Sequence, residues 1–296
     1  MLAWAIIGMR HTRLNDGDTV TRQAPVRMTT ERKLHDSDAR YFQAAAETIE
    51  VMDGKLSWMQ DLISQAGGCV FHSVTKLPDP SQDACKLWLT ELEQLFVQRD
   101  VPRCRFYLQE EFPEHAAWFE SLGYKQVPEL GLFAELDKQG VDIGSSDNDF
   151  ALIETDLIET RPEHWDLYKA LLETADATPD GHRMQADDYA ALERAKAESG
   201  YMQAYIHIVE GEALAVGNLD CINGMARVKN VLVHPQQRGK GIGKKVVAAL
   251  MDIGRQQGAK QAGAYALEEN QSAVAMYHSL GFKDVYFQYE WTRSLN

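Results

Sequence analysis

The chain has 296 residues, of which 45% are apolar and 25% are charged, so it is long enough and apolar enough to form two globular domains. Its formal net charge of -14 argues against nucleic acid as a partner, because such binding depends on Lys and Arg side chains that neutralise phosphates. No apolar run reaches the roughly 20 residues of a membrane span, so the sequence predicts a cytoplasmic protein with no membrane partner.

The first part of the chain is interpreted as a short extension followed by a domain. Residues 1–26 form the extension; their apolar start has no basic residue before it, so a signal peptide is not expected. Residues 27–138 form the first predicted domain. Strands and helices alternate in its later part, with strands at 69–75, 103–108 and 126–136 and helices at 82–98 and 114–122.

A linker is predicted over residues 139–150, where the run QGVDIGSSDND is rich in Gly, Ser, Asp and Asn. The second domain, 151–296, contains three alternating strands separated by Glu210-Gly211 and Asn223-Gly224, a pattern that predicts an antiparallel meander. The predicted strands lie at 150–157, 201–209, 212–221, 225–233, 261–267 and 282–292, and the predicted helices at 161–174, 185–198, 241–257 and 271–280. Both domains are therefore expected to be α+β, each with a mostly antiparallel mixed sheet flanked by helices.

The two halves resemble each other in sequence. With an offset of 158 residues (265 minus 107), Tyr107-Leu-Gln-Glu-Glu falls on Tyr265-Ala-Leu-Glu-Glu, and Ser121-Leu-Gly-Tyr falls on Ser279-Leu-Gly-Phe. Equal order and spacing favour duplication of one unit.

A glycine-rich turn in the second half is typical of anion binding. Gly239, Gly241 and Gly243 connect a predicted strand to a predicted helix, so free amides and the helix dipole would converge there. The stretch 227–245 contains no Asp or Glu but has a group of basic residues, namely Arg227, Lys229, His234, Arg238, Lys240, Lys244 and Lys245. The turn lacks the GxxxxGK[ST] pattern of a P-loop and follows a meander rather than opening a βαβ unit.

This turn resembles the R/Q-x-x-G-x-G/A acyl-CoA loop of the GNAT superfamily of N-acyltransferases. A second resemblance to the family lies in Asn270-x-x-Ala-x-x-x-Tyr277-x-x-x-Gly-Phe282, and together the two cover about residues 150–296. The repeat then implies a tandem arrangement in which the first copy is degenerate. In the offset comparison the loop falls on PSQDAC (80–85), which has no glycine, and Tyr277 falls on Phe119.

The resemblance implies acetyl-CoA as co-substrate and assigns roles to individual residues. Leu232 and Val233 would pair with the pantetheine amides, Asn270 would contact the pantetheine arm, and Tyr277 would be the general acid. The main-chain amides that would hold the diphosphate are those of Arg238, Gly239, Lys240, Gly241, Ile242 and Gly243.

The general base and the acceptor stay open. The strand 225–233 carries no carboxylate, so Asp220, Glu154, His234 and a chain of water molecules are all candidates for the base. An acceptor amine is expected to be bound by the region 165–200, where candidate residues are Trp165, Tyr168, Asp176 and Asp187. The acidic chain favours a cationic acceptor, and the oligomeric state cannot be deduced.

Cys69, Cys85, Cys104 and Cys221 form no CxxC pair, so neither a metal site nor a cysteine nucleophile is expected. The leading hypothesis is therefore direct acetyl transfer to a primary amine in a ternary complex. The alternatives are a non-catalytic acyl-CoA sensor and a purely structural scaffold.

Overall fold

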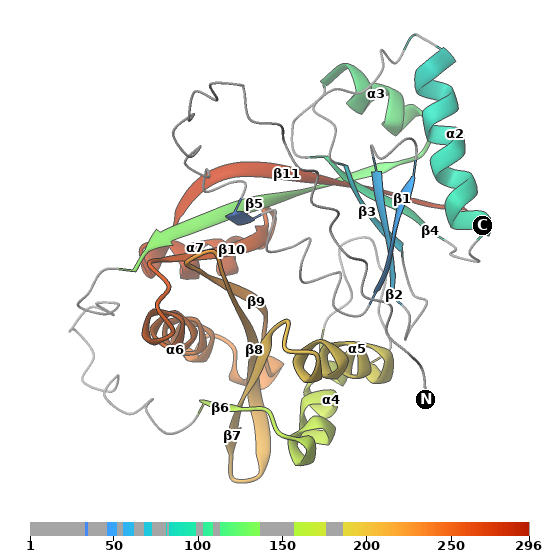
Figure 1. Cartoon of the computed structure of the whole chain (residues 1–296). Coiled ribbons are helices and arrows are strands. Elements are labelled where there is room, and N and C mark those ends of the chain that lie inside the picture. Colours follow the sequence, from blue (N-terminus) through green and yellow to red (C-terminus); the bar gives the residue numbers. More distant parts are fainter. Residues whose placement is uncertain are drawn as a thin grey trace, which may run out of the picture.

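The structure is a computed structural model of the chain, shown in Figure 1. It describes residues 33–34, 46–51, 56–61, 68–72, 81, 83–98, 103–108, 113–136, 157–175 and 186–295. The predicted extension 1–26 and the predicted linker 139–150 lie outside these residues.

The described strands belong to one continuous sheet of eleven strands, in the order β1-β2-β3-β4-β11-β5-β10-β9-β8-β7-β6. Only the pairs β3/β4 and β9/β10 are parallel, so the sheet is mixed and mostly antiparallel. The strands are β1 (Ala46–Val51), β2 (Leu56–Asp61), β3 (Gly68–His72), β4 (Arg103–Leu108), β5 (Lys125–Glu135), β6 (Leu157–Glu159), β7 (Gln203–Val209), β8 (Glu212–Ile222), β9 (Met225–Val233), β10 (Gln261–Leu267) and β11 (Lys283–Ser294).

Helices cover this sheet, and each lies close to its predicted range. The helices are α2 (Asp83–Gln98), α3 (Pro113–Ser121), α4 (Trp165–Glu173), α5 (Ala186–Glu198), α6 (Ile242–Gln256) and α7 (Gln271–Ser279), with 3-10 turns η2 (Pro162–His164) and η3 (Pro235–Gln237). The α+β class is therefore confirmed. The expectation of a separate sheet in each half differs from the single sheet observed.

The last strand of each half lies between strands of the other half. β11 pairs with β4 and β5, whereas β10 pairs with β5 rather than with β11. In Figure 1, β5 and β11 run side by side as two long strands through the middle of the molecule. Sequence periodicity does not specify which strands pair over such separations, so this exchange was not predicted.

The pairing registers of the two halves agree. Val70 pairs in parallel with Phe106, and Arg227 pairs in parallel with Gly263, so the partners are 36 residues apart in both halves (106 minus 70, 263 minus 227). The antiparallel pairs β4/β11 and β10/β5 also correspond, apart from the one residue that a bulge inserts in β11.

The hydrophobic cores follow the exchange of strands. Leu130 and Leu132 of β5 are buried in the core beneath α6 and α7, together with Leu250 and Tyr277. Trp291 of β11 is buried in the core beneath α2 and α3. Each half therefore supplies apolar side chains that the other half buries, which couples their folding.

The meander β7-β8-β9 has the predicted antiparallel pairing and tight turns. Glu210 and Gly211 have φ of 53° and 87°, and Asn223 and Gly224 have φ of 51° and 75°. Positive φ at both central residues is the type I′ geometry that matches strand twist.

Candidate active site

The candidate site begins where β9 separates from β10. The two strands pair only from Met225 to Arg227 on β9 and from Gln261 to Gly263 on β10. Further along, β9 remains paired with β8, and β10 remains paired with β5. Among the described strands, none pairs with the opposite edge of β9 along its second half, which we call the open edge.

A β-bulge lies in this second half of β9. The register shifts between Val216 and Asn218 of β8, so that two residues of β9, Asn230 and Val231, oppose the single residue Gly217. Asn230 has φ of 51°, a left-handed conformation that Asn tolerates better than most residues. A Cβ on Gly217 would lie 2.9 Å from Leu250, so the glycine lets α6 pack directly on the bulge.

After β9 the chain makes the glycine turn that the sequence predicts. Gly239 and Gly241 have φ of 77° and 78°, and a Cβ at either would meet nothing within 4 Å. Gly243 differs, because a Cβ there would lie 3.3 Å from the sulfur of Met276. The first two glycines thus serve the turn's conformation and leave open space around it, whereas the third allows α6 to approach α7.

Main-chain amides of this turn are available to a ligand. Within the described chain, the N–H groups from Gly239 to Lys244 donate no main-chain hydrogen bond, and the first helical bond runs from the Lys245 amide to the Gly241 carbonyl at 3.0 Å. They are the free donors expected at a helix N-terminus, where the helix dipole favours an anion. The Arg238 amide instead donates to the Pro235 carbonyl at 3.3 Å.

The two predicted strand contacts differ in orientation. His234 donates its amide to the Leu214 carbonyl of the paired β8 strand at 2.9 Å. Because peptide groups alternate along a strand, the N–H and C=O of Leu232 also point toward β8, whereas those of Val233 point toward the open edge. The Val233 carbonyl accepts a hydrogen bond of 3.3 Å from Arg238 Nε. Of this pair, Val233 is the residue placed to meet a ligand.

Asn270 is the N-cap of α7. Its Oδ1 accepts hydrogen bonds from the Ala273 amide at 3.1 Å and from Ser272 Oγ at 2.9 Å. The side chain is held by its cap yet exposed, so its Nδ2 group can donate to a ligand. Capping Asn residues are common, and the sequence alone could not separate this role from ligand contact.

Tyr277 lies on α7 and is 6% exposed. Burial raises the pKa of its phenol to about 12, and the Arg227 guanidinium acts in the opposite direction. The phenol is therefore protonated at neutral pH, as a general acid must be. Met276, its neighbour on α7, is the residue that Gly243 of the glycine turn approaches.

Arg227 does not belong to the solvent-facing basic group that the sequence suggests. It is 2% exposed; its guanidinium lies 4.5 Å from the centroid of the Tyr265 ring, and Nη1 donates to the Val228 carbonyl at 2.7 Å. The guanidinium is thus a buried cation at the junction of β9 and β10. Lys240 and Arg238 are exposed beside the glycine turn.

The candidate bases are placed as follows. Asp220 is 3% exposed and directly opposite Arg227 on β8, and His234 Nδ1 accepts a hydrogen bond from the Gln236 amide at 3.3 Å. Glu154 lies outside the described residues. The geometry thus gives Asp220 a cationic neighbour across the strand pair and gives His234 a capping role.

The residues predicted to bind the acceptor differ in their exposure. Trp165 and Tyr168 are buried, with ring centroids 5.0 Å apart, and belong to a core cluster. Asp187 is exposed and forms an ion pair with Lys169 at 2.5 Å. Asp176 lies outside the described residues.

The sequence analysis missed Glu193, a fully buried carboxylate on α5. Its Oε1 accepts from Lys196 Nζ at 3.0 Å, and its Oε2 accepts from Asn230 Nδ2 at 3.0 Å and from Asn218 Nδ2. A helical Glu three residues before a Lys is typical of a surface pair, so no sequence signal separated it from its exposed neighbours.

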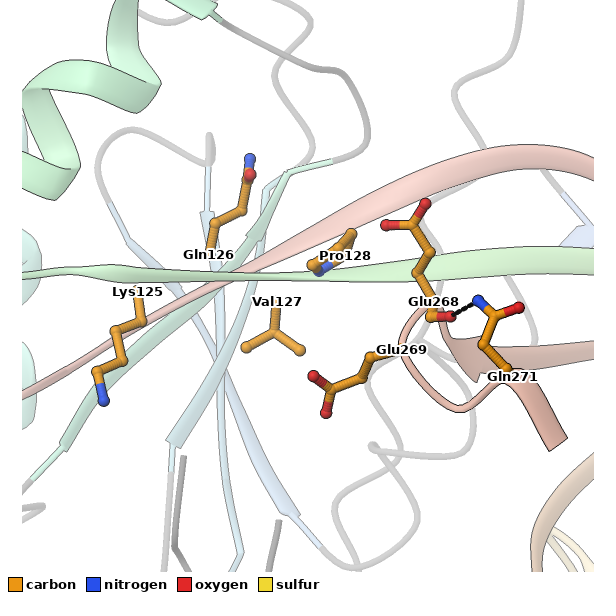
Figure 2. Close-up of a pocket in the computed structure, with 7 residues that line it drawn as sticks. All are labelled: Lys125, Gln126, Val127, Pro128, Glu268, Glu269 and Gln271. Atoms are coloured by element: carbon orange, nitrogen blue, oxygen red, sulfur yellow. Dashed lines mark hydrogen bonds between the residues drawn. The ribbon is translucent and has the colours of Figure 1, made fainter. Parts of the chain in front are cut away.

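A pocket of about 380 Å³ adjoins Asn270 (Figure 2). Glu268, Glu269 and Gln271, which flank Asn270 in the loop between β10 and α7, line one side. The start of β5, from Lys125 to Pro128, lines the other, so the two halves of the chain form this pocket together. The Glu268 amide donates to the Pro128 carbonyl at 3.1 Å, and Gln271 Nε2 donates to the Glu268 carbonyl at 2.8 Å.

In the first half, aromatic rings fill the position that corresponds to Tyr277. Phe119 is completely buried, and its ring centroid lies 5.0 Å from that of Trp291 and 5.3 Å from that of Phe106. Tyr124, which packs on Phe119 at 5.9 Å, donates its hydroxyl to Glu93 Oε1 at 2.8 Å. This packing leaves a hydrophobic core where the second half has a phenol.

The described residues contain no group of three or more His, Cys, Asp or Glu side chains that could hold a metal ion. Among the helices described, none has the length and apolar character needed to cross a membrane. Cys85, Cys104 and Cys221 are free thiols, and burial raises the pKa of Cys104 to about 12 and that of Cys221 to about 11. The Cys69 side chain is outside the description.

Comparison with known families agrees with this geometry. Residues 163–282, which are less than half of the chain, match the model of the Acetyltransferase (GNAT) family. The match includes β9, the glycine turn and α7. Members of the family normally use acetyl-CoA as co-substrate.

Two curated relatives align with part of the chain. The uncharacterized N-acetyltransferase YobR of Bacillus subtilis (strain 168) is 29% identical over 84 residues, which are 28% of this chain and 34% of that protein. The L-methionine sulfoximine/L-methionine sulfone acetyltransferase of Salmonella typhimurium (strain LT2) is 38% identical over 53 residues, which are 18% of this chain and 31% of that protein. The chain thus spans about a third of the length of these relatives.

A solved structure extends the likeness to most of the chain. The GCN5-related N-acetyltransferase from Kribbella flavida superposes with a TM-score of 0.59 and 13% identity, covering 91% of this chain and 97% of that one. At this identity the likeness concerns the fold alone.

Proposed function

We propose that the chain is an N-acetyltransferase that passes an acetyl group from acetyl-CoA to a primary amine by direct attack in a ternary complex. The observation that carries the proposal is the row of main-chain amides from Gly239 to Gly243, which donate no main-chain hydrogen bond within the described chain. Around Gly239 and Gly241 a side chain would meet nothing within 4 Å, so this part of the turn has room for a ligand. A diphosphate bound there would be held by N–H donors and by the helix dipole. The Arg238 amide, engaged in its own turn, contributes least.

The rest of the site fits a thioester that extends from this cradle. Val233 offers its peptide N–H at the open edge of β9, while its carbonyl is engaged by Arg238, and Asn270 offers its Nδ2 from the start of α7. Tyr277 would then donate a proton to sulfur. A thiol has a pKa of about 8.5 and a phenol one of about 10, and burial of Tyr277 raises its pKa further, so the phenol remains protonated until the thiolate forms.

Bond changes in this reaction are simple. The amine nitrogen forms a bond to the carbonyl carbon, the carbon–sulfur bond breaks with its electron pair passing to sulfur, and Tyr277 protonates the sulfur. The nitrogen loses one proton, for which Asp220, His234 and a water chain stay candidates. The buried Cys104 and the partly buried Cys221, with raised pKa values, are neutral thiols at pH 7 and do not favour an acyl-enzyme.

For the first half, residues 27–138, we propose a degenerate GNAT-like copy. Its support is the agreement of strand registers and turns between the halves. In the first half, Tyr124 donates its amide to the Phe119 carbonyl at 3.1 Å. In the second half, Phe282 donates its amide to the Tyr277 carbonyl at 3.2 Å. Gly123 and Gly281 both have φ of 85°. Because Phe119 is packed in a full aromatic core, we assign this half no transfer chemistry.

The alternative is an acyl-CoA sensor without turnover. Two observations favour it: Tyr277 packs in the core, and β9 carries the buried Arg227 and no carboxylate. Thiol release from acetyl-CoA over a panel of primary amines and peptides separates the two functions. Turnover with one amine class supports the transferase. Binding of CoA by calorimetry without thiol release for any amine supports the sensor, and no binding at all refutes both.

A further inference from the structure

We infer that Glu193 and Asn230 are positioning residues that fix the β9 bulge and thereby the strand edge that receives the pantetheine arm. This inference rests on the proposed function. It assigns a role to a buried carboxylate that the chemistry of transfer does not use.

The carboxylate joins the two strands at the bulge itself. Its Oε2 accepts from Asn218 on β8 and from Asn230 on β9, and these two residues lie beside the point where the pairing register shifts. One oxygen atom thus holds both strands of the distorted pair. Gly217, on the other face of the sheet, lies against Leu250 of α6, and Val231 packs against the same core, so the bulge is held from both faces.

The surroundings of Glu193 keep it in place. Lys196 is 2% exposed and donates to Oε1, so the buried charge has a cationic partner. Tyr168, also buried, donates its hydroxyl to Asn218 Oδ1 at 3.3 Å. A hydrogen bond between the Tyr189 hydroxyl and Asn230 lowers the pKa of that phenol, although burial, the largest effect, leaves it well above the ordinary value. With its oxygens engaged by N–H donors, Glu193 is suited to hold backbone rather than to accept an amine proton.

The bulge determines which peptide groups reach the open edge. Adding one residue to β9 reverses the alternation of its peptide groups beyond Asn230. Val233 therefore faces the open edge because the bulge is present. If Asn230 lost its link to Glu193, this edge would become variable, while the amides from Gly239 to Gly243 would keep their turn.

The test compares two substitutions of the same kind. Asn230 and Asn223 both have φ of 51°, and glycine adopts this conformation freely, so Asn230→Gly and Asn223→Gly each remove a side chain without straining the backbone. Asn223 lies exposed in the β8–β9 turn. Affinity is measured by calorimetry for CoA and for 3′-phosphoadenosine 5′-diphosphate, which has the diphosphate but no pantetheine.

We expect Asn230→Gly to weaken CoA binding about tenfold and to change binding of the shorter ligand less than twofold. Asn223→Gly should leave both affinities unchanged. Equal affinities of Asn230→Gly and the wild type for CoA overturn the inference, and so does an equal loss for both ligands, which indicates general disruption. A wild-type chain that binds neither ligand refutes the proposed function instead.

A second variant tests the carboxylate. Glu193→Gln combined with Lys196→Met removes the buried pair without leaving an unpaired ammonium. The control is Glu198→Gln on the same helix, an exposed residue that pairs with Arg194. A CoA-specific loss of about tenfold in the double variant alone supports the positioning role. A lowered unfolding midpoint with an unchanged ratio of the two affinities shows a purely structural role and overturns it.

Discussion

The rings of Tyr277 and Phe282 meet edge to face, with centroids 5.1 Å apart and an interplanar angle of 69°. Phe282 follows the turn that ends α7, so this contact fixes the tyrosine ring against the last strand. The ring belongs to the core, and its hydroxyl is the part that the proposed chemistry uses.

Tyr277→Phe therefore separates chemistry from packing. The substitution keeps the ring contact and removes only the proton donor, so we expect kcat to fall about 100-fold while CoA affinity changes less than twofold. Thiol release and calorimetry measure the two effects. Unchanged turnover would refute the general-acid role.

The glycine turn can be tested with strain held constant. Gly241→Ala and Gly258→Ala both place a side chain at positive φ (78° and 91°) in open space, so each should cost roughly 1–2 kcal/mol of unfolding free energy. We expect only Gly241→Ala to weaken CoA binding, by tenfold or more, because only this residue lies among the free amides. Equal CoA affinities in the two variants would contradict the cradle.

The pH dependence of turnover follows from burial of Tyr277. Its pKa is raised from 10 to about 12, so the phenol keeps its proton at higher pH than an exposed tyrosine does. We expect no loss of kcat from phenol ionisation between pH 9 and about 10.5, whereas an ordinary phenol would be half ionised near pH 10. The folded state binds this proton more tightly than the unfolded state does. The contribution of Tyr277 to stability is therefore complete below pH 10 and is lost as the pH rises toward 12. A descending limb centred near pH 10 that Tyr277→Phe abolishes would overturn this prediction.

Residues 139–296 produced alone should not fold into an active domain. In this fragment β10 would lose β5, and β11 would lose both β4 and β5, which leaves unpaired edges prone to aggregation. We expect the fragment to be insoluble, and co-expression with residues 1–138 to restore a soluble complex that binds CoA. As a control, cleavage of the full chain at a protease site placed in the predicted linker should leave the complex intact. A monomeric fragment that binds CoA would contradict the prediction.

Local features were predictable because local chemistry determines them. The Asn223-Gly224 turn, the glycine turn before α6 and the α6 apolar stripe were all found from spacing and residue type. Features that depend on distant contacts were not. Glu193 reads as a surface residue until Asn218 and Asn230 are placed beside it, and the positive φ of Asn230 arises from a bulge that no turn motif marks.

Strands β1 and β2 were not predicted. The burial of Arg227 was also unexpected, because the sequence grouped it with bases such as Lys229 and Arg238, which are half-exposed or exposed. The exchange of β5 and β11 was not predicted because it depends on pairing between distant segments. Periodicity shows that a segment is a strand, but the partner is selected by the sheet as a whole.

The place of β5 also bears on how the chain can change over generations. If the first half is the degenerate copy proposed above, it is free to lose its ligand residues, as the run at 80–85 and Phe119 illustrate. Its final strand is not free in this way, because deleting it would open the middle of the only sheet described. Natural selection would then preserve this half as architecture, even with no reaction of its own.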